Sequence, residues 1–495
     1  MKDLAHCYIN IIRLHKPFHT LLFLISTFFL FGFLSVVFPE KGIYISEKLS
    51  IKYPTFASLF YEKKNQHVDI SSIIALSDAE EKAIETNRDT AEIKAIELKD
   101  TAVKLITSIQ YKNATKSAMA SFFNSLASIN SEEKSIRVLH YGDSQIEGDR
   151  ITDYLRLKLQ SQFGGEGPGL ISFMPVTPSV INKISWSSNW DRYSVFTGKD
   201  KRVKHTNFGA LAHITRFSGY KQLADTTQYK SAWVKIVTSK NGGAKATAFK
   251  KMKLFYGGSQ AKTHVELYEN GSLNNSDSLV SGGNFNIKEF TLNQSALLHE
   301  FKFTGRDSPD FYGVSLESGK GVMVDNFGLR GSSGTFFNQI NFSQLKNFYD
   351  YLNTKLIILQ FGGNVLPYTK TSEQAAEFGL YLKSQIAIIK KIAPQASILV
   401  IGPADMSVKE GTEYVTHPQL ENLRDAIKKT AFEYDCAFFD MYNCMGGRNS
   451  MVTWVEEGIG AKDYIHFSTG GARKIAVLLY SSLINDYNSF AKNKK

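Results

Sequence analysis

The stretch SIRVLHYGDSQIEGDRIT, residues 135–152, decides the fold. Its first part, Ser135–Tyr141, is a short apolar run of the kind that forms a buried strand. A Gly-Asp-Ser turn follows, and a helix is expected around Arg150–Phe163. A serine on the turn directly after a strand, beside a helix N-terminus, has an exposed hydroxyl and feels the positive potential of the helix end. Ser144 is therefore the candidate nucleophile.

Strands and helices alternate again in the last third of the chain. Strands are expected at Val322–Phe327, Lys355–Phe361, Ser397–Ile401 and Ala437–Met441, and helices after Thr335 and at Ser372–Ile392, Gln419–Tyr434 and Gly470–Ser482. Apolar, β-branched strands that alternate with helices predict a parallel sheet covered on both faces. The fold class is therefore α/β.

The region between these two blocks, 175–320, has a different pattern. Short β-forming runs alternate there with Asn, Gly and Ser clusters; the runs are Ala232–Val237, Lys253–Tyr256, Thr263–Tyr268 and Glu300–Thr304. This pattern predicts an all-β unit, a sandwich or jelly roll, inserted into a loop of the α/β domain. Insertion after the first strand–helix unit would bring it to the carboxyl edge of the sheet, where open α/β folds bind ligands.

The N-terminal region carries a membrane signal. Residues 21–38 are uncharged and apolar on all sides, about the minimum length for a spanning helix. Lys2, Arg13 and Lys16 precede this run, which places the N-terminus in the cytoplasm and the rest outside. A cleaved signal peptide is the alternative, although no A-x-A-like site follows. The predicted organisation is 1–20 cytoplasmic, 21–38 signal anchor, 39–130 juxtamembrane region and helical stalk, 131–174 first hydrolase part, 175–320 β insertion that could bind glycan, and 321–495 second hydrolase part.

Composition excludes several classes of protein. Hydrophobic residues make up 43% and charged residues 21% of the chain, as in ordinary globular proteins. The net charge of +11 is diffuse, without a nucleic-acid-binding motif, and favours attraction to anionic envelope polymers. Cys436 and Cys444 are either a disulfide or two small buried side chains. No Cys–His cluster has zinc-site spacing, so no metal is expected.

Four segments carry the chemistry of ester cleavage. Ser144 would attack the carbonyl carbon, and His466 would take its proton and return it to the leaving alcohol. Asp463, in the Asp-Tyr-Ile-His segment before the last helix, would orient the imidazole. The backbone amides of Ser144 and Gly331 and the side chain of Asn364 would hold the oxyanion.

These segments resemble the SGNH, or GDSL, hydrolase family. Gly-Asp-Ser at Ser144, the glycine turn at Gly331, Gly-Gly-Asn at Asn364 and Asp-x-x-His at His466 match the family's blocks in the family's order. Valine follows Asn364, where many members have aspartate. The resemblance implies a flavodoxin-like three-layer α/β/α domain and ester or acyl-transfer activity without metal or organic cofactor. Some exported members, the peptidoglycan O-acetylesterases, carry an inserted β-sandwich.

Further residues are candidates for contact with substrate. They are Arg330 beside the oxyanion region, Gly363, and Trp454 in the loop before Asp463, for which a packed loop is the competing interpretation. Gly328 and Gly334 compete with Gly331 for the oxyanion role. Glu147 and Asp149 are expected to be capping or surface groups.

The predicted function is O-acyl ester chemistry on an envelope polysaccharide at the outer side of the cytoplasmic membrane, with O-acetyl as the expected group. An esterase leads; a transferase would need a membrane-bound acyltransferase partner to deliver the acyl group. A lipid esterase or thioesterase and a non-catalytic glycan-binding protein are the other hypotheses. No nucleic-acid partner is expected.

Overall fold

The computed structural model describes residues 17–39, 42–46, 49–51, 53–56, 66–86, 107–113, 116–131, 134–196, 200–220, 228–239, 242–293 and 296–492. The chain divides into two compact units, one of residues 1–66 with 408–415, the other of 67–407 with 416–495. Lys2, Cys7, Arg13 and Lys16, on which the predicted orientation depends in part, lie outside the described residues.

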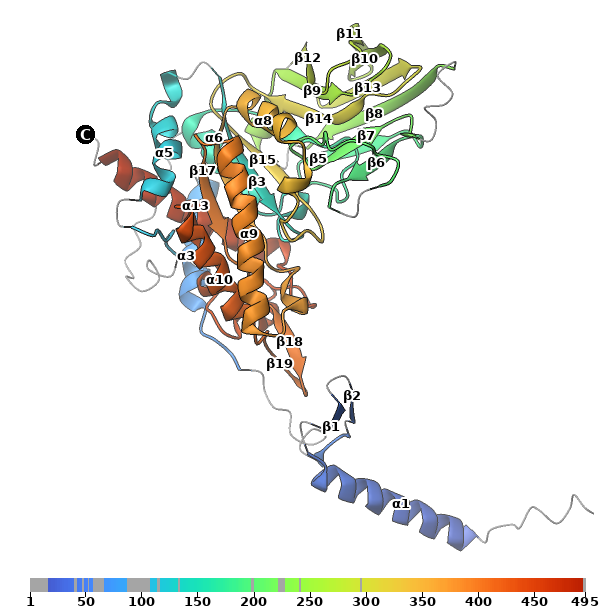
Figure 1. Ribbon diagram of the computed structural model, residues 1–495. Coiled ribbons are helices and arrows are strands. Elements are labelled where there is room, and N and C mark those ends of the chain that lie inside the picture. The colour runs from blue at the N-terminus through green and yellow to red at the C-terminus, as the bar shows by residue number, and fades with distance from the viewer. Residues whose placement is uncertain are drawn as a thin grey trace, which may run out of the picture. The chain divides into compact units, whose positions relative to one another are not determined.

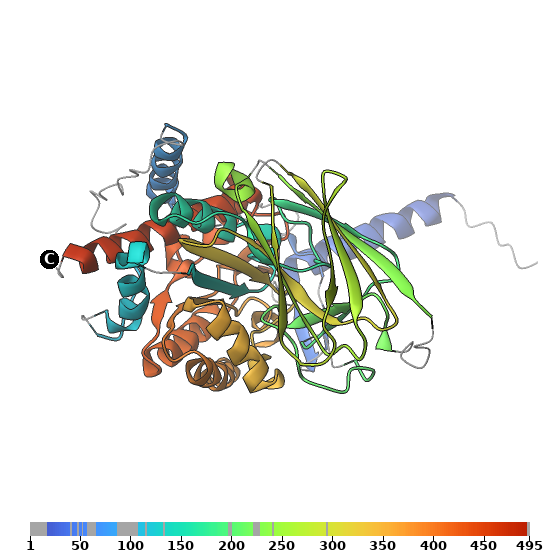
Figure 2. The ribbon, with the colours of Figure 1, turned by 90° about the horizontal axis from the view of Figure 1, so that it is seen from above.

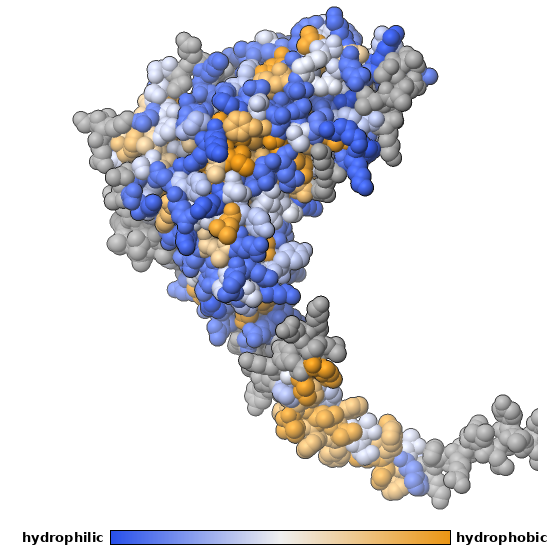
Figure 3. Space-filling model, viewed as in Figure 1, coloured by the Kyte–Doolittle hydropathy of each residue, from blue (hydrophilic) through white to orange (hydrophobic). Residues whose placement is uncertain are grey.

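The first unit is built around one long apolar helix, α1 (Pro17–Val37), followed by the antiparallel strands β1 (Ile43–Ser46) and β2 (Leu49–Ile51). The helix begins before the predicted 21–38 segment and ends one residue before Phe38. Nearly all of its side chains are exposed, and Figure 3 shows the visible face of α1 as almost wholly apolar. It is long and apolar enough to cross a membrane.

The second unit contains a five-stranded parallel sheet in the order β15-β3-β16-β17-β20. Numbered by their sequence within the sheet, the strands lie in the order 2-1-3-4-5, which is the flavodoxin-like order. The bounds are β3 Ile136–Gly142, β15 Val322–Gly328, β16 Thr354–Gln360, β17 Ser397–Ile401 and β20 Ala437–Phe439. The predicted strands all form, each within two residues of its expected ends.

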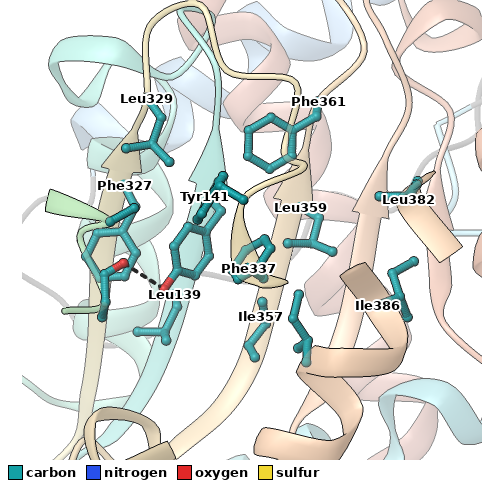
Figure 4. Close-up of a cluster of buried hydrophobic side chains, with 14 of the residues drawn as sticks. Leu139, Tyr141, Phe327, Leu329, Phe337, Ile357, Leu359, Phe361, Leu382 and Ile386 are labelled. Carbon is teal, nitrogen blue, oxygen red and sulfur yellow. Dashed lines mark hydrogen bonds between the residues drawn. The ribbon is translucent and has the colours of Figure 1, made fainter. Parts of the chain in front are cut away.

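Helices cover both faces of this sheet, which confirms the predicted three layers (Figure 1). One face carries α6 (Thr152–Phe163), α13 (Thr469–Lys492) and α5 (Ala120–Ala127), and the other carries α8 (Phe342–Tyr351), α9 (Ser372–Ile392) and α10 (Leu420–Glu433). Figure 4 shows the second face, where side chains of β3 and β16 meet Leu382 and Ile386 of α9. The strands are buried on both faces, which explains why most of their residues are apolar.

Local sequence signals explain why the long helix α9 has the predicted bounds. Thr371 precedes it and accepts a hydrogen bond from the Gln374 amide, as an N-cap residue does. The helix ends at Ile392, and Pro394 follows closely, where a helix cannot continue. Short elements complete the domain: η3 Glu147–Asp149, η6 Phe337–Gln339, η7 Leu366–Tyr368, α11 Met441–Cys444 and α12 Ser450–Glu456. The hairpin strands β18 (Ser407–Glu410) and β19 (Glu413–Thr416) lie almost wholly in the segment 408–415 of the first unit.

The inserted region forms two antiparallel sheets that face each other across an aromatic core, beside the α/β domain (Figure 2). One sheet has the order β11-β10-β13-β8-β5, and the other has the order β12-β9-β14-β7-β6 with β4 paired to β14. The bounds are β4 Gly169–Ile171, β5 Asn182–Trp186, β6 Asp191–Ser194, β7 His213–Arg216, β8 Lys230–Thr238, α7 Ala244–Thr247, β9 Lys251–Gly257, β10 Thr263–Glu269, β11 Ser272–Leu279, β12 Asn286–Thr291, β13 Leu298–Gly305 and β14 Asp310–Glu317. The predicted sandwich therefore forms, and β4 extends it to before residue 175.

A buried ion network joins the insertion to the α/β sheet. Arg137 of β3 donates to Asp325 of β15 at 2.8 Å and also pairs with Glu317 of β14. The Asp325 carboxylate accepts the Leu170 amide at 2.8 Å as well. Buried ion pairs hold a defined geometry because an unpaired partner would be costly. The network therefore fixes the insertion at its junction with the sheet.

The 39–130 segment differs from the expected stalk. Its described helices α3 (Ser71–Thr86) and α5, with η1 (Ser117–Met119) and η2 (Ile129–Ser131), belong to the second unit. Ile73 of α3 and Phe122 and Phe123 of α5 are buried in the same core as strand residues such as Val138. These helices therefore pack against the hydrolase domain, because their apolar faces extend its core. Residues 87–106 lie outside the described part. Cys436 and Cys444 are free and buried.

Candidate active site

The candidate nucleophile lies on a tight turn at the carboxyl end of β3. Gly142 ends the strand, and a Cβ there would lie 2.9 Å from Ile146 Cδ1 and 3.1 Å from the Gln360 carbonyl oxygen, so the turn is tightly packed at this glycine. The Asp143 carboxylate accepts the Gln145 amide at 2.9 Å and closes the turn. Ser144 is left partly exposed. The α-helix α6 begins only at Thr152, so the expected helix N-terminus beside Ser144 is wrong; the short η3 intervenes.

Three side chains from distant parts of the sequence form a continuous hydrogen-bonded chain. Ser144 Oγ lies 2.8 Å from His466 Nε2, and His466 Nδ1 lies 2.7 Å from Asp463 Oδ2. The second carboxylate oxygen of Asp463 accepts the backbone amides of Ile465 and His466, both at 2.9 Å. Partial burial acts to raise the pKa of Asp463, but the hydrogen bonds from His466 and Ile465 outweigh it and the pKa lies below its ordinary value. The carboxylate is therefore ionised where imidazolium would form.

Two further residues, which the sequence analysis did not single out, hold this arrangement. The Gln145 side chain donates to the Ile465 carbonyl at 2.8 Å and accepts the Phe467 amide at 3.4 Å, so it binds both neighbours of His466. The Arg150 guanidinium donates to the carbonyl of Ser144 and to that of Glu147. A glutamine directly after Ser144 and an arginine six residues after it are the sequence signal that could have suggested Gln145 and Arg150. Their hydrogen bonds to the backbone are seen only in the fold.

The oxyanion candidates follow the neighbouring strands β15 and β16. Gly331 is exposed, has a φ of +79°, and a Cβ there would meet nothing within 4 Å. The amides of Gly328 and Gly334 already donate to Asn326 and Ser332, whereas the Gly331 amide has no acceptor among the described residues. This difference favours Gly331 over Gly328 and Gly334 as the backbone donor to the oxyanion.

Asn364 belongs to the same cluster of loops. Its side-chain amide donates to the Ser332 carbonyl at 3.1 Å, which joins the loop after β16 to the loop that holds Gly331. An amide nitrogen carries two hydrogens, so one donor of Asn364 is free to serve a ligand. Gly363 lies against Asp143, since a Cβ at Gly363 would be 3.3 Å from Asp143 Oδ2. The three loops therefore meet at one edge of the sheet.

Other candidates have structural roles. Trp454 is fully buried and donates to the Met445 carbonyl at 2.9 Å, so its proposed contact with substrate is wrong. Arg330 pairs with the buried Glu147 carboxylate at 2.6 Å and is otherwise exposed. Glu147 and Asp149, expected to be capping or surface groups, are buried; Asp149 pairs with Arg156 at 2.9 Å. No metal-holding group of His, Cys, Asp or Glu occurs in the part of the chain that the structure describes.

His140 and Asp143 are buried groups with shifted acidity. Burial lowers the pKa of His140 to about 4, and its ring nitrogens contact Gln360 Oε1 and Thr152 Oγ1, both at 3.0 Å. Burial raises the pKa of Asp143 to about 6, against the opposing effects of the Gln145 amide and His466. His140 is thus a neutral core residue.

A small hollow lies beside the catalytic chain. Its lining includes Asp143 and Gln145, which flank Ser144, and Gly363, Met406 and Ile465. The empty space, including its mouth, is about 310 Å³. The hollow is therefore small.

The parallel sheet with Ser144, Asn364 and His466 at its carboxyl edge defines an SGNH-type α/β hydrolase domain. Residues 277–474 match the GDSL-like Lipase/Acylhydrolase family. The match includes Gly331, Asn364, Asp463 and His466 but not Ser144, which lies on the far side of the β insertion in sequence.

Among solved structures, one has a TM-score above 0.5 and shares this fold, and others match at lower scores. A peptidoglycan O-acetylesterase is 21% identical with a TM-score of 0.59, over 77% of this chain and 99% of that one. An acetyl xylan esterase is 16% identical with a TM-score of 0.25, over 33% and 81% of the two chains. A family two carbohydrate esterase from Cellvibrio japonicus is 9% identical with a TM-score of 0.24, over 62% and 99%. No curated protein matches the sequence.

Proposed function

We propose that this protein is a membrane-anchored serine esterase that removes O-acetyl groups from an envelope polysaccharide, with peptidoglycan as the leading substrate. The observation that carries the proposal is the chain of short contacts from Ser144 through His466 to Asp463. The family domain supports ester chemistry. The name of the peptidoglycan O-acetylesterase that shares the fold suggests the substrate.

The proposed reaction has two halves. Ser144 Oγ attacks the acetyl carbonyl carbon while His466 Nε2 takes the hydroxyl proton, and the amides of Ser144, Gly331 and Asn364 receive the oxyanion. Collapse breaks the bond to the sugar oxygen, which leaves with the proton from His466. Water then attacks the acetyl-serine with His466 as base, and acetate and free Ser144 are released. Asp463 remains a carboxylate and stabilises imidazolium throughout.

The small hollow supports a short acyl group. A long acyl chain would require an extended apolar channel, whereas this space is bounded by Gly363, Pro403 and Met406 beside the candidate nucleophile. Acetyl has only one carbon beyond the carbonyl carbon. The size of the hollow therefore favours an acetylesterase over a lipid esterase or thioesterase.

Hydrolysis is favoured over transfer because the triad is open to water. The side chains of His466 and Asp463 are 33% and 47% exposed. A transferase must exclude water while a sugar hydroxyl takes the acyl group from the same acyl-enzyme, and it would need a membrane acyltransferase as donor. Hydrolysis needs neither a site closed to water nor a membrane acyltransferase.

The compartment is proposed from α1 and the preceding basic residues. The apolar helix would span the cytoplasmic membrane as an uncleaved anchor, with Lys2, Arg13 and Lys16 on the cytoplasmic side. The domains after it would then face the periplasm or the outer side. This places an esterase where envelope polysaccharide is found.

The test uses the full chain in detergent with p-nitrophenyl acetate and O-acetylated peptidoglycan. The wild-type protein should release acetate from both, and Ser144→Ala should lose nearly all of this activity. Ser372→Ala, an exposed serine at the start of α9, is the matched control and should be unchanged. Equal rates for Ser144→Ala and wild type would contradict the esterase, and acetyl transfer to a deacetylated glycan at the expense of acetate release would favour the transferase.

A further inference from the structure

A second cavity lies between the hydrolase domain and the inserted β domain. Its lining includes Glu147, Gly328 and Leu329 from the hydrolase loops and Arg192 and His213 from the β domain. The empty space, including the open solvent at its mouth, is about 760 Å³. Glu147 follows Ser144 on the same turn, and Leu329 lies just before Gly331. The cavity therefore shares its wall with the loops of the candidate active site.

Polar groups without a protein partner gather in this cavity. Arg192 Nε, Arg156 Nη1 and both side-chain atoms of Asn182 are buried, line the cavity and make no hydrogen bond within the protein. Asn182 and Arg156 are each 2% exposed. Buried polar groups of native proteins nearly always have a hydrogen-bond partner. This cluster therefore indicates a site that binds a polar ligand or water.

Arg192 is the cation of the cavity that lacks a counter-charge. Among the described residues it makes no ion pair, whereas Arg156 pairs with Asp149 at 2.9 Å and Glu147 pairs with Arg330 at 2.6 Å. Burial lowers the pKa of Arg192 to about 10, so the guanidinium remains charged at neutral pH. A buried charge is ordinarily paired, and a planar guanidinium matches a carboxylate best.

His213 does not supply the missing charge. Its ring nitrogens contact Ser172 Oγ at 2.6 Å and the Leu211 carbonyl at 2.8 Å. Burial and the nearby Arg192 hold the pKa of His213 well below its ordinary value, so the ring is neutral. The carboxylates of the cavity are engaged and its histidine is uncharged. The Arg192 guanidinium therefore lacks an anion, and the Asn182 side-chain amide lacks a hydrogen-bond partner such as a hydroxyl.

We propose that this cavity is a subsite for a carboxylate-bearing sugar of the polysaccharide substrate, with Arg192 bound to the carboxylate and Asn182 to a hydroxyl. The proposal rests on the proposed function, because it assigns the substrate as an acidic glycan. The subsite would place a charged sugar next to the loops that carry Ser144 and Gly331. The β insertion would thereby select substrate as well as flank the cleft.

The kinetic test uses two substrates that differ only at C6, O-acetylated methyl glucuronide and O-acetylated methyl glucoside. Arg192→Gln should lower kcat/KM for the glucuronide about tenfold or more, the usual worth of a charge-assisted hydrogen bond, and leave the glucoside unchanged. Arg192→Lys should restore part of the loss. Lys183→Gln removes an exposed charge from the same domain and should change neither rate. An equal effect of Arg192→Gln on both substrates, or none on either, would overturn the proposal.

A binding test separates this proposal from the proposed function. Methyl glucuronide and methyl glucoside are titrated calorimetrically into Ser144→Ala, with and without Arg192→Gln, and p-nitrophenyl acetate hydrolysis by the Arg192→Gln single variant reports an intact catalytic centre. Selective binding of the glucuronide that requires Arg192 supports the subsite even if the wild type releases no acetate. Binding of neither probe would show a cavity that holds only water, and binding of both alike would show no charge recognition; either result contradicts the subsite.

Discussion

Gln145 binds the backbone on both sides of His466, donating to the Ile465 carbonyl at 2.8 Å and accepting the Phe467 amide at 3.4 Å. The residue next to the candidate nucleophile therefore positions the loop of the candidate base. Tyr464 in that loop has a φ of +58°, an unfavourable value for a non-glycine residue, so the loop needs such external ties.

We expect Gln145→Ala to lower kcat for p-nitrophenyl acetate by about tenfold to a hundredfold, because small displacements of a catalytic group cost rates of this order. KM should change little, since Gln145 acts through His466. Gln339→Ala, at an exposed glutamine, is the matched control. A variant with wild-type kcat would show that the loop holds His466 without Gln145.

Asn364→Ala should lower kcat by about 10²–10³, the usual effect of removing one oxyanion donor. The Asn364 side chain also contacts the Ser332 carbonyl, so unfolding of the variant is measured alongside its steady-state kinetics. A rise in KM with unchanged kcat would instead assign Asn364 to ground-state substrate binding.

Asp143 should make folding stability depend on pH. Burial raises its pKa from 3.8 to about 6, so the folded state holds a proton that the unfolded state releases. The resulting stabilisation is present below about pH 4 and is lost as the pH rises through about 6. Asp143→Asn removes this dependence, so its stability relative to wild type should rise between pH 4 and 7, by on the order of 3 kcal/mol. Urea unfolding across that range measures the difference; a constant offset would contradict the shifted pKa.

Arg137 should be a main determinant of stability. Arg137→Met leaves the Asp325 and Glu317 carboxylates buried without their guanidinium, which should cost about 3–5 kcal/mol in unfolding free energy. Arg202→Met, which removes a half-exposed pair with Asp200, should cost at most about 1 kcal/mol. Equal losses in urea unfolding would show that the buried network has no special role.

The sequence predicted the α/β domain well because its signals are local. Buried parallel strands such as Ser397–Ile401 are unbroken apolar runs, and the capping threonine and the following proline mark the bounds of α9. Ser144, Asp463 and His466 are candidates from sequence because Ser144 follows a strand and the other two precede the last helix, and the fold brings the three side chains into contact.

The sequence-based expectations that differ from the structure share one physical cause. In each case the residues are buried by contacts that depend on the tertiary fold and not on the local sequence. Trp454 appeared to be a cleft residue from its place in a loop, yet it fills the core. Glu147 appeared to be a surface charge but pairs with Arg330 in the cavity wall. The helix α3 has enough charge to suggest a stalk, but a few apolar residues of α3 and α5 pack these helices against the domain. Hydrogen bonds between a side chain and a distant backbone segment, such as those of Gln145, produce no periodic pattern in the sequence.

The most direct test is the mass of the protein after brief reaction with p-nitrophenyl acetate and acid quench, followed by peptide mapping. We expect one acetyl group on the peptide that contains Ser144, no adduct in Ser144→Ala, and much slower acetylation in His466→Ala. An adduct on another residue, or Ser144→Ala that turns over substrate at the wild-type rate, would contradict a reaction centred on Ser144.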